Sequence, residues 1–302
     1  MGKLLVYYGE VSTRRRIFTR GSGYIALALI WLMVFLVLPS LRMAAMGFAE
    51  RGEYGDVTWA FTLKNFQRLC GFGLLGWSSD FVWILFRSLW IGFVTTAFSV
   101  LLAYPVSFFI ATRPPRTRYL WLALVVIPSC TNLVIRTCAW VPLFSSSMPL
   151  AQICQFLHII EPGASLSPSP FAVYVGMVSC FLPFTILPLY TSVERLDWSI
   201  VEAANDLYAG KTRTFFHAIL PQTLPGLSTA VILTFIPSVG VFVVPDLLGG
   251  AKYMLVGNLI QQQFFASRDW PFGAAICFGL MALTLLGLFI IRKSDDDEGI
   301  TV

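Results

Sequence analysis

A polar, helix-forming stretch, VEAANDLYAGKTRTFFHAILPQ at 201–222, interrupts a chain that is otherwise mostly apolar. Glu202 lies early in the predicted helix, where a carboxylate complements the positive end of the helix dipole, and two alanines of high helix propensity follow it. Asp206 and Gly210 recur at four-residue spacing on the same face. We predict two short helices on the membrane surface, joined by a turn near 208–211 and shaped to dock on a soluble partner. The alternative is an exposed loop helix without a partner.

Polar side chains at membrane depth are costly, so those within apolar runs are candidates for a transport path. Asp246 is the clearest anion, and its carboxylate could attract a cation. It could equally cap the following turn or pair with Arg136. Ser129, Asn132 and Arg136 follow at i, i+3 and i+7, so we predict that they share one helix face. Arg136 would repel a cationic cargo unless another group neutralised it.

Aromatic and helix-breaking residues supply further path candidates. Trp140 and Tyr174 could hold a cation against their ring faces, although most such aromatics pack between helices or lie at the membrane interface. Pro237, Ser238 and Gly240 predict either a broken helix that exposes carbonyl oxygens or a packing kink. The substrate-path candidates are therefore Asp246, Ser129, Asn132, Trp140, Tyr174 and Ser238.

No residue set in the sequence matches a catalytic or metal site. The two histidines, His158 and His217, lie outside the apolar runs, so an intramembrane enzyme would lack a His/Asp or Ser/His set. The six cysteines form neither CxxC nor a Cys/His cluster, and a Cys70–Cys154 disulfide stays open as a possibility. The GxxxxGK[ST] phosphate loop is absent, so the chain is not expected to hydrolyse ATP itself. We expect no metal and no cofactor bound by this chain.

Composition places these candidates in an integral membrane protein. Hydrophobic residues make up 57% and charged residues 12% of the 302 residues, about half the charged share of soluble proteins. A spanning helix needs about 20 apolar residues. The predicted spans are 24–47, 81–111, 119–144, 171–191, 226–244 and 272–291. Continuous rather than alternating hydrophobicity argues against a β-barrel. The predicted fold class is therefore an all-α integral membrane protein with six transmembrane helices.

The basic residues predict the orientation of these spans. Thirteen Lys and Arg side chains fall on the side that holds both termini, and five fall in the opposite segments, 49–80, 145–170 and 247–271. Both termini are therefore predicted to be cytoplasmic. The net charge of +5 reflects basic residues that gather on one side of the membrane. No nucleic-acid partner is predicted. The expected organisation is a retained cytoplasmic segment at 1–23, a six-span domain at 24–292 with its largest cytoplasmic loop at 192–225, and an acidic, irregular tail at 293–302.

The stretch EAANDLYAGKTRTFFHAILP resembles the EAA loop of ABC importer permeases, whose pattern is EAA, three residues, Gly, nine residues, Ile, one residue, Leu-Pro. The opening EAA and the closing Leu-Pro match without a gap. Tyr208 stands where the glycine is expected, and Ala218 stands where the isoleucine is expected. Glycine supplies a backbone conformation that is costly for other residues. We therefore predict that the turn is displaced onto Gly210.

A second resemblance covers most of the chain, from about 61 to 285. The stretch VPDLLGGAKYMLVGNLIQQQFFASRDWPFGAA, together with FTLKNFQRL and FRSLWIGFVTTAFSVLLAYPVSFFIA, is similar to permeases of spermidine/putrescine importers. The resemblance implies a type I ABC importer permease of MetI-like fold in the bacterial inner membrane. It also implies a second, different permease chain, two ATPase subunits that use ATP and magnesium, and an outer binding protein.

The same resemblance implies which residues couple the permease to its ATPase, and it implies a polyamine cargo. Ferric iron, an amino-acid derivative or an oxyanion are alternative cargoes for the same machinery. A stand-alone secondary carrier would predict inverted repeats, which the sequence does not show, and would leave the EAA loop unexplained. The coupling residues implied by the resemblance are Glu202, Ala203, Ala204, Asp206, Gly210, Leu220 and Pro221.

Overall fold

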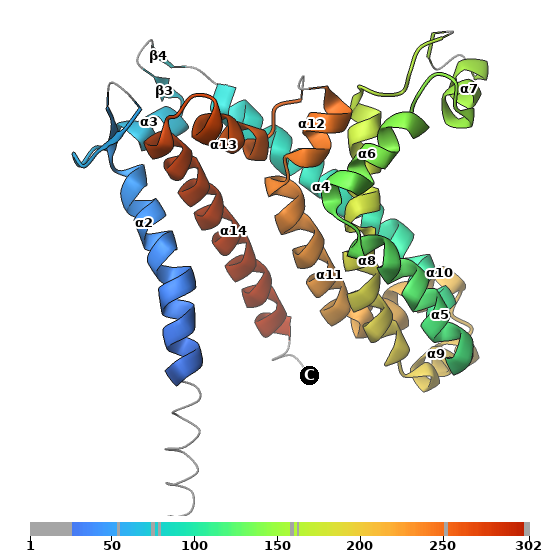
Figure 1. Ribbon diagram of the computed structural model, residues 1–302. Helices are drawn as coiled ribbons and strands as arrows, with labels where there is room; N and C mark the ends of the chain where they lie inside the picture. Colours follow the sequence, from blue (N-terminus) through green and yellow to red (C-terminus); the bar gives the residue numbers. More distant parts are fainter. Residues whose placement is uncertain are drawn as a thin grey trace, which may run out of the picture.

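The computed structural model describes residues 26–52, 55–73, 76–77, 80–157, 160–161, 163–250 and 253–298, and this part of the chain is built almost entirely of helices (Figure 1). Five helices are long and apolar enough to cross a membrane. They are Ala26–Gly47, Asp80–Ala111, Pro170–Glu194, Lys211–Gly240 and Trp270–Phe289. A bent pair, Pro115–Cys130 and Leu133–Leu143, raises the number to six if it is one span. The prediction of an all-helical membrane protein is confirmed.

Three long helices form the centre of the molecule: α4 (Asp80–Ala111), α8 (Pro170–Glu194) and α11 (Leu220–Gly240). Their contacts combine apolar packing with interhelical hydrogen bonds. The hydroxyls of Thr185 on α8 and Thr234 on α11 lie 2.7 Å apart and are buried, and the Tyr104 hydroxyl on α4 lies 3.0 Å from that of Thr223. A side chain at Gly226 would collide with Ser192 on α8, so this glycine permits the close approach of α11.

The stretch 119–144, expected to be one continuous span, contains a sharp bend. Helix α5 (Pro115–Val126) and the 3-10 turn η2 (Ile127–Cys130) meet α6 (Leu133–Leu143) at 95°. Asn132 caps the N-terminus of α6, because its side-chain oxygen accepts a hydrogen bond from the Val134 amide at 2.8 Å. The prediction that Ser129, Asn132 and Arg136 share one helix face is therefore wrong, since the chain changes direction between them.

The fifth predicted span, 226–244, is also different in extent. Helix α10 (Lys211–Thr214), a π-helical turn η3 (Phe215–Ile219) and α11 form one helix of 30 residues that ends at Gly240. Pro221 and Pro225 therefore do not stop the helix. Pro221 lacks an N–H group and crowds the preceding turn, and widening that turn to a π-helix accommodates it. The helix continues through Pro237 and Ser238 and ends at Gly240, so the interruption falls on the last of the three residues predicted for a break or a kink.

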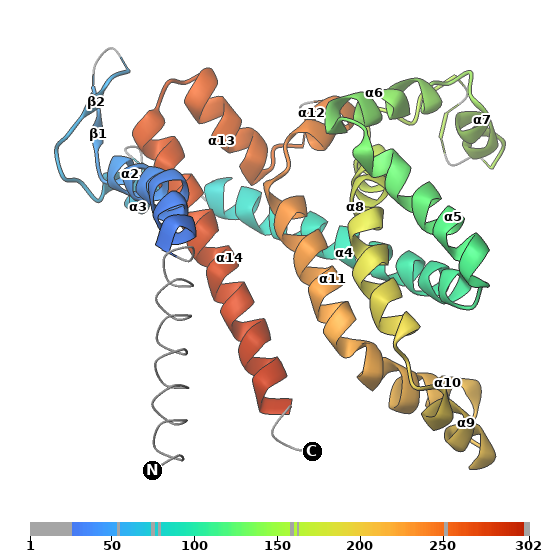
Figure 2. The ribbon, with the colours of Figure 1, turned by 60° about the horizontal axis from the view of Figure 1, so that its bottom comes forward.

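The end of the molecule opposite α9 (Trp198–Asp206) holds two β-hairpins and several short helices that connect the spans (Figure 2). A hairpin of β1 (Glu50–Arg51) and β2 (Val57–Thr58) precedes α3 (Lys64–Leu69), and a second antiparallel pair joins β3 (Phe72–Gly73) to β4 (Gly76–Trp77). The segment 145–170 contains α7 (Pro149–Phe156). Between α11 and the last helix lie α12 (Val243–Gly249) and α13 (Val256–Phe265).

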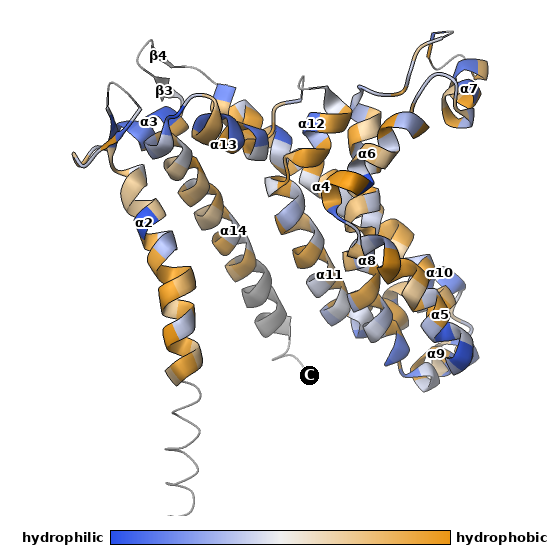
Figure 3. Cartoon of the chain, in the orientation of Figure 1, coloured by the Kyte–Doolittle hydropathy of each residue, from blue (hydrophilic) through white to orange (hydrophobic). Residues whose placement is uncertain are grey.

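The first and last spans form a separate pair beside the three central helices. Helix α2 (Leu38–Gly47), which continues the π-turn η1 (Met33–Val37), packs against α14 (Trp270–Glu298), as Figure 1 shows. The backbone of α14 continues to Glu298, so the start of the acidic tail, expected to be irregular, is helical. Hydrophobic residues cover the middle of the helices, and hydrophilic ones gather toward the two ends (Figure 3).

Candidate functional site

The short helix α9 (Trp198–Asp206) holds Glu202, Ala203 and Ala204 at the end of the molecule opposite α12 and α13 (Figure 2). Asp197 caps this helix. Its carboxylate oxygen Oδ1 accepts hydrogen bonds from the Ser199 amide at 3.0 Å and the Ser199 hydroxyl at 2.7 Å. These hydrogen bonds lower the pKa of Asp197 from its ordinary value, so the cap persists until the pH falls well into the acid range.

Gln222 connects the start of α9 to the long helix that follows. Its side-chain oxygen accepts a hydrogen bond from the Asp197 amide at 3.0 Å, and its side-chain nitrogen donates to the Ala218 carbonyl at 2.8 Å. This bridge fixes the position of α9 relative to η3 and α11. Sequence analysis missed Asp197 and Gln222, although an aspartate directly before a helical stretch is a readable N-cap signal.

The turn after α9 has its left-handed residue at Tyr208, not at Gly210. Tyr208 has φ of 56°, whereas Gly210 has an extended backbone with φ of −66° and caps α10. The Ala209 amide donates to the Ala204 carbonyl at 3.1 Å, and the Tyr208 amide donates to the Asn205 carbonyl at 2.9 Å. These two bonds form a Schellman motif, which requires a left-handed residue at the Tyr208 position. The prediction that Gly210 forms the turn is therefore wrong.

The surface of this turn is unusually apolar for a helix end. Tyr208 is 98% exposed and Leu207 is 82% exposed, while Glu202 and Asp206 are exposed beside them. Val201 is buried and anchors α9 against the rest of the chain. The coupling residues Ala203, Gly210 and Pro221 are also exposed, whereas Ala204 and Leu220 are partly buried. The predicted set thus lies together at one end of the molecule, across α9 and the first turns of the long helix.

Replacing Tyr208 by glycine tests the backbone cost of this turn. We expect Tyr208→Gly to stabilise the isolated permease by about 1 kcal/mol, because a left-handed conformation costs about that much for a residue with a Cβ atom. The exposed side chain has little packing to lose. Thermal unfolding in detergent measures the change, and Gly210→Ala is the matched control. A lower melting temperature for Tyr208→Gly would contradict the assignment.

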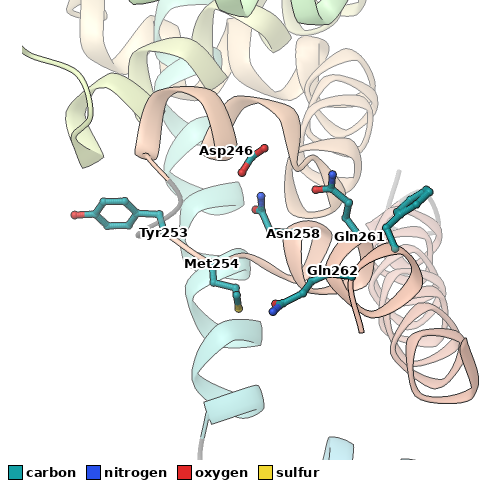
Figure 4. A pocket seen from close by; sticks show the side chains of 8 residues that line it. Asp246, Tyr253, Met254, Asn258, Gln261 and Gln262 are labelled. Carbon is teal, nitrogen blue, oxygen red and sulfur yellow. The ribbon is translucent and has the colours of Figure 1, made fainter. Parts of the chain in front are cut away.

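At the opposite end, Asp246 on α12 and the polar face of α13 line a cavity of about 240 Å³. Figure 4 shows the Asp246 carboxylate close to the side-chain amides of Asn258 and Gln261. The ion pairs in the described part of the chain are Lys64–Glu50, Arg68–Asp269 and Arg118–Glu194, so the alternative pairing of Asp246 with Arg136 does not occur there. Arg136 instead donates to the Pro128 carbonyl at 3.1 Å.

The other predicted path residues do not converge on this cavity. Ser238 is fully buried beside Gly92, where it donates to the Phe235 carbonyl and serves packing. Trp140 stacks on Phe144 at 5.4 Å between ring centroids. Ser129 donates to the Val126 carbonyl within η2.

Tyr174 lies in a neighbouring cavity of about 150 Å³. Arg87 lines this cavity as well, and its positive charge makes the cavity unsuitable for a cation.

Both Cys70 and Cys154 have free thiols, so they are not paired with each other.

A family profile for the binding-protein-dependent transport system inner membrane component matches residues 103–296. The chain belongs to this family. The match spans α5 to α14, so it includes α9 with its turn at one end of the molecule and the α12–α13 cavity at the other. A member of this family is an inner-membrane subunit that works with a separate binding protein.

Individual relatives agree with the family match. The chain is 38% identical over 259 residues to the spermidine/putrescine transport system permease protein PotB of Escherichia coli K12, covering 84% of this chain and 92% of the relative. It is 34% identical over 271 residues to PotB of Haemophilus influenzae, covering 90% and 92%.

A solved structure has the same fold. A chain of a bacterial alginate ABC transporter, solved with its alginate-bound periplasmic protein, superposes with a TM-score of 0.68 at 13% identity, covering 89% of this chain and 91% of that one. At this low identity, the likeness supports the permease fold alone.

Proposed function

We propose that this chain is the permease subunit of an ATP-driven importer for polyamines such as spermidine and putrescine. The observation that carries the proposal is the 38% identity to a spermidine/putrescine permease across 84% of the chain. A binding protein would deliver the cargo, and a second permease chain would complete the channel. A pair of ATPase subunits would supply energy from ATP and magnesium.

The bent pair formed by α5 and α6 counts as one crossing in this proposal, which gives six spans. An even number of spans places both termini on one side. The excess of Lys and Arg near 113–118 and 195–213 supports our placing of the α9 end in the cytoplasm. The α12–α13 end then faces the binding protein.

Glu202, Ala203 and Asp206 form the proposed contact surface for the ATPase, with the exposed turn at Tyr208 beside them. ATP binding would draw the two ATPases together and move the docked α9 helices with them. The Gln222 bridge would pass that movement directly to α11, which packs along α4 and α8. Reorientation of the spans would open the channel formed by the two permease chains alternately to the two sides of the membrane.

Reconstitution of the complete importer tests the cargo. We expect proteoliposomes that hold both permeases and the ATPase to take up spermidine or putrescine when the loaded binding protein and ATP are present. ATPase activity should rise with the polyamine-loaded binding protein. Uptake or stimulation only with an iron-loaded, amino-acid-loaded or oxyanion-loaded binding protein would contradict the polyamine assignment while leaving the permease role intact.

A further inference from the structure

Helix α13 is amphipathic, and its two faces have different surroundings. Val256 and Leu259 are buried and pack with Phe272 and Ile276 of α14. On the other face, polar and aromatic side chains recur at i, i+3, i+4 and i+7. They are Asn258, Gln261, Gln262 and Phe265, and all of them line the cavity that contains Asp246. We call this cavity the Asp246 cup.

Hydrogen bonding fixes the orientation of the Asn258 amide. Its nitrogen Nδ2 donates to the Phe242 carbonyl at 3.2 Å, and a carbonyl can only accept, so the two ends of the amide are not interchangeable. The oxygen Oδ1 is buried and has no hydrogen-bond partner in the described part of the chain. A buried acceptor without a partner is costly. This unsatisfied acceptor belongs to a residue that lines the cup, but the oxygen atom itself is closed off from the cavity.

The walls of the cup combine acceptors with apolar surface. Gln261 and Gln262 can each turn an amide oxygen toward the cavity, while Met254 and Phe265 supply apolar contact. A polyamine has the complementary pattern, because its primary ammonium groups are N–H donors separated by methylene chains. The neighbouring cavity lacks this character, since Arg87 lines it and lies 5.6 Å from the ring of Tyr253.

We propose that the Asp246 cup binds a primary ammonium group of the cargo on the side that faces the binding protein. This inference rests on the proposed polyamine import. The Asp246 carboxylate would form the charge-assisted contact, and the side-chain oxygens of Gln261 and Gln262 would accept the remaining N–H groups. The cup would receive one end of the cargo before it reaches the central helices.

Uptake by the complete reconstituted importer, with loaded binding protein in limiting amount, tests the cup. We expect Asp246→Asn to lower spermidine uptake about tenfold, the size of effect expected from the loss of one charge-assisted contact. Basal ATPase activity and complex assembly should not change. Asp56→Asn is the matched control, because Asp56 is an exposed carboxylate near the β-hairpin and outside the cup. Asp246→Glu should restore part of the uptake.

A gain-of-function variant provides an independent measurement. Gln261→Glu adds a second carboxylate to the cup and should raise uptake at limiting loaded binding protein. Unchanged spermidine uptake in both Asp246→Asn and Gln261→Glu would overturn the cup. If the unmodified complex takes up no polyamine at all, the proposed cargo fails instead.

Lys252 is the rival cation, because it follows Asp246 closely in the sequence. If the Asp246 carboxylate serves Lys252 rather than cargo, Lys252→Gln should lower uptake as much as Asp246→Asn does, which would overturn the proposal. If the cup binds cargo, Lys252→Gln should leave uptake unchanged or raise it. Complex assembly and basal ATPase activity, measured in parallel, identify any variant that fails to fold.

Discussion

Glu202→Lys is expected to lower ATP-driven uptake by about tenfold or more. A surface that complements the Glu202 carboxylate would repel a lysine at the same position, and like charges placed across a docking surface cost several kcal/mol. Glu202 is exposed in the middle of α9, on the end of the molecule where the proposed ATPase contact lies. The side chain makes no hydrogen bond within the described residues, so the fold should tolerate the change. Co-purification of the ATPase with the permease and polyamine uptake in proteoliposomes measure the effect.

The control for this variant is Asp295→Lys, which makes the same charge change in the acidic C-terminal run DDDE. It should leave uptake close to that of the unmodified complex. If Glu202→Lys retained ATPase co-purification and uptake at the level of the unmodified complex, the docking role of α9 would be contradicted.

Asp269→Ala is expected to destabilise the protein by about 3 kcal/mol, because it removes a helix cap and leaves a charged partner unpaired. The Asp269 side chain is only 4% exposed and lies 3.0 Å from Arg68 Nη1. Its other oxygen accepts from the Phe272 amide at 3.2 Å, at the start of α14. Arg68 also lies over the Phe272 ring at 4.0 Å, so one cluster joins α3 to α14.

Thermal unfolding in detergent or nanodiscs measures this loss. Asp269→Asn retains a cap acceptor and should cost less than Asp269→Ala. Glu50→Gln breaks the exposed Lys64–Glu50 pair at the same end and should cost under about 1 kcal/mol. Equal melting temperatures for Asp269→Ala and Glu50→Gln would show that the buried pair adds nothing beyond a surface contact.

Hydropathy predicted which parts of the chain enter the membrane but not how each helix is interrupted. The run 119–144 is apolar throughout, and the 95° bend inside it leaves the average hydropathy unchanged. The local signal was Pro128 followed by Asn132, a turn proline and an N-cap residue. Pro221 gives the opposite signal, since a proline normally ends a helix, but here a π-turn accommodates it and the helix continues.

The turn at Tyr208 shows that the conformation is determined by the hydrogen bonds of the whole turn rather than by one residue. The glycine position of the family pattern keeps its left-handed backbone even though tyrosine occupies it. Two Schellman hydrogen bonds outweigh a strain of about 1 kcal/mol. Moving the turn to Gly210 would have required a different end to α9.

The cup could be predicted only in part. The spacing of Asn258, Gln261 and Gln262 is a polar helix face that the sequence displays openly. Its meeting with Asp246 depends on how α12 and α13 fold back over the end of α11, and the backbone turns at Gly240 and Gly250 decide that arrangement. The sequence therefore identified Asp246 as a candidate but not the amide side chains of Asn258, Gln261 and Gln262.

The continuous helix from Lys211 to Gly240 would act as an unequal lever if it tilted about its contact with α8. Its 30 residues correspond to about 45 Å at the α-helical rise. The Thr185–Thr234 hydroxyl contact lies six residues from Gly240 and 23 residues from Lys211, which gives arms of about 9 Å and about 35 Å. If the helix tilts about this fulcrum, the α9 end travels about four times as far as the end beside the cup. A small shift at the Asp246 cup would then correspond to a displacement about four times as large at the α9 end, where we propose that the ATPase docks.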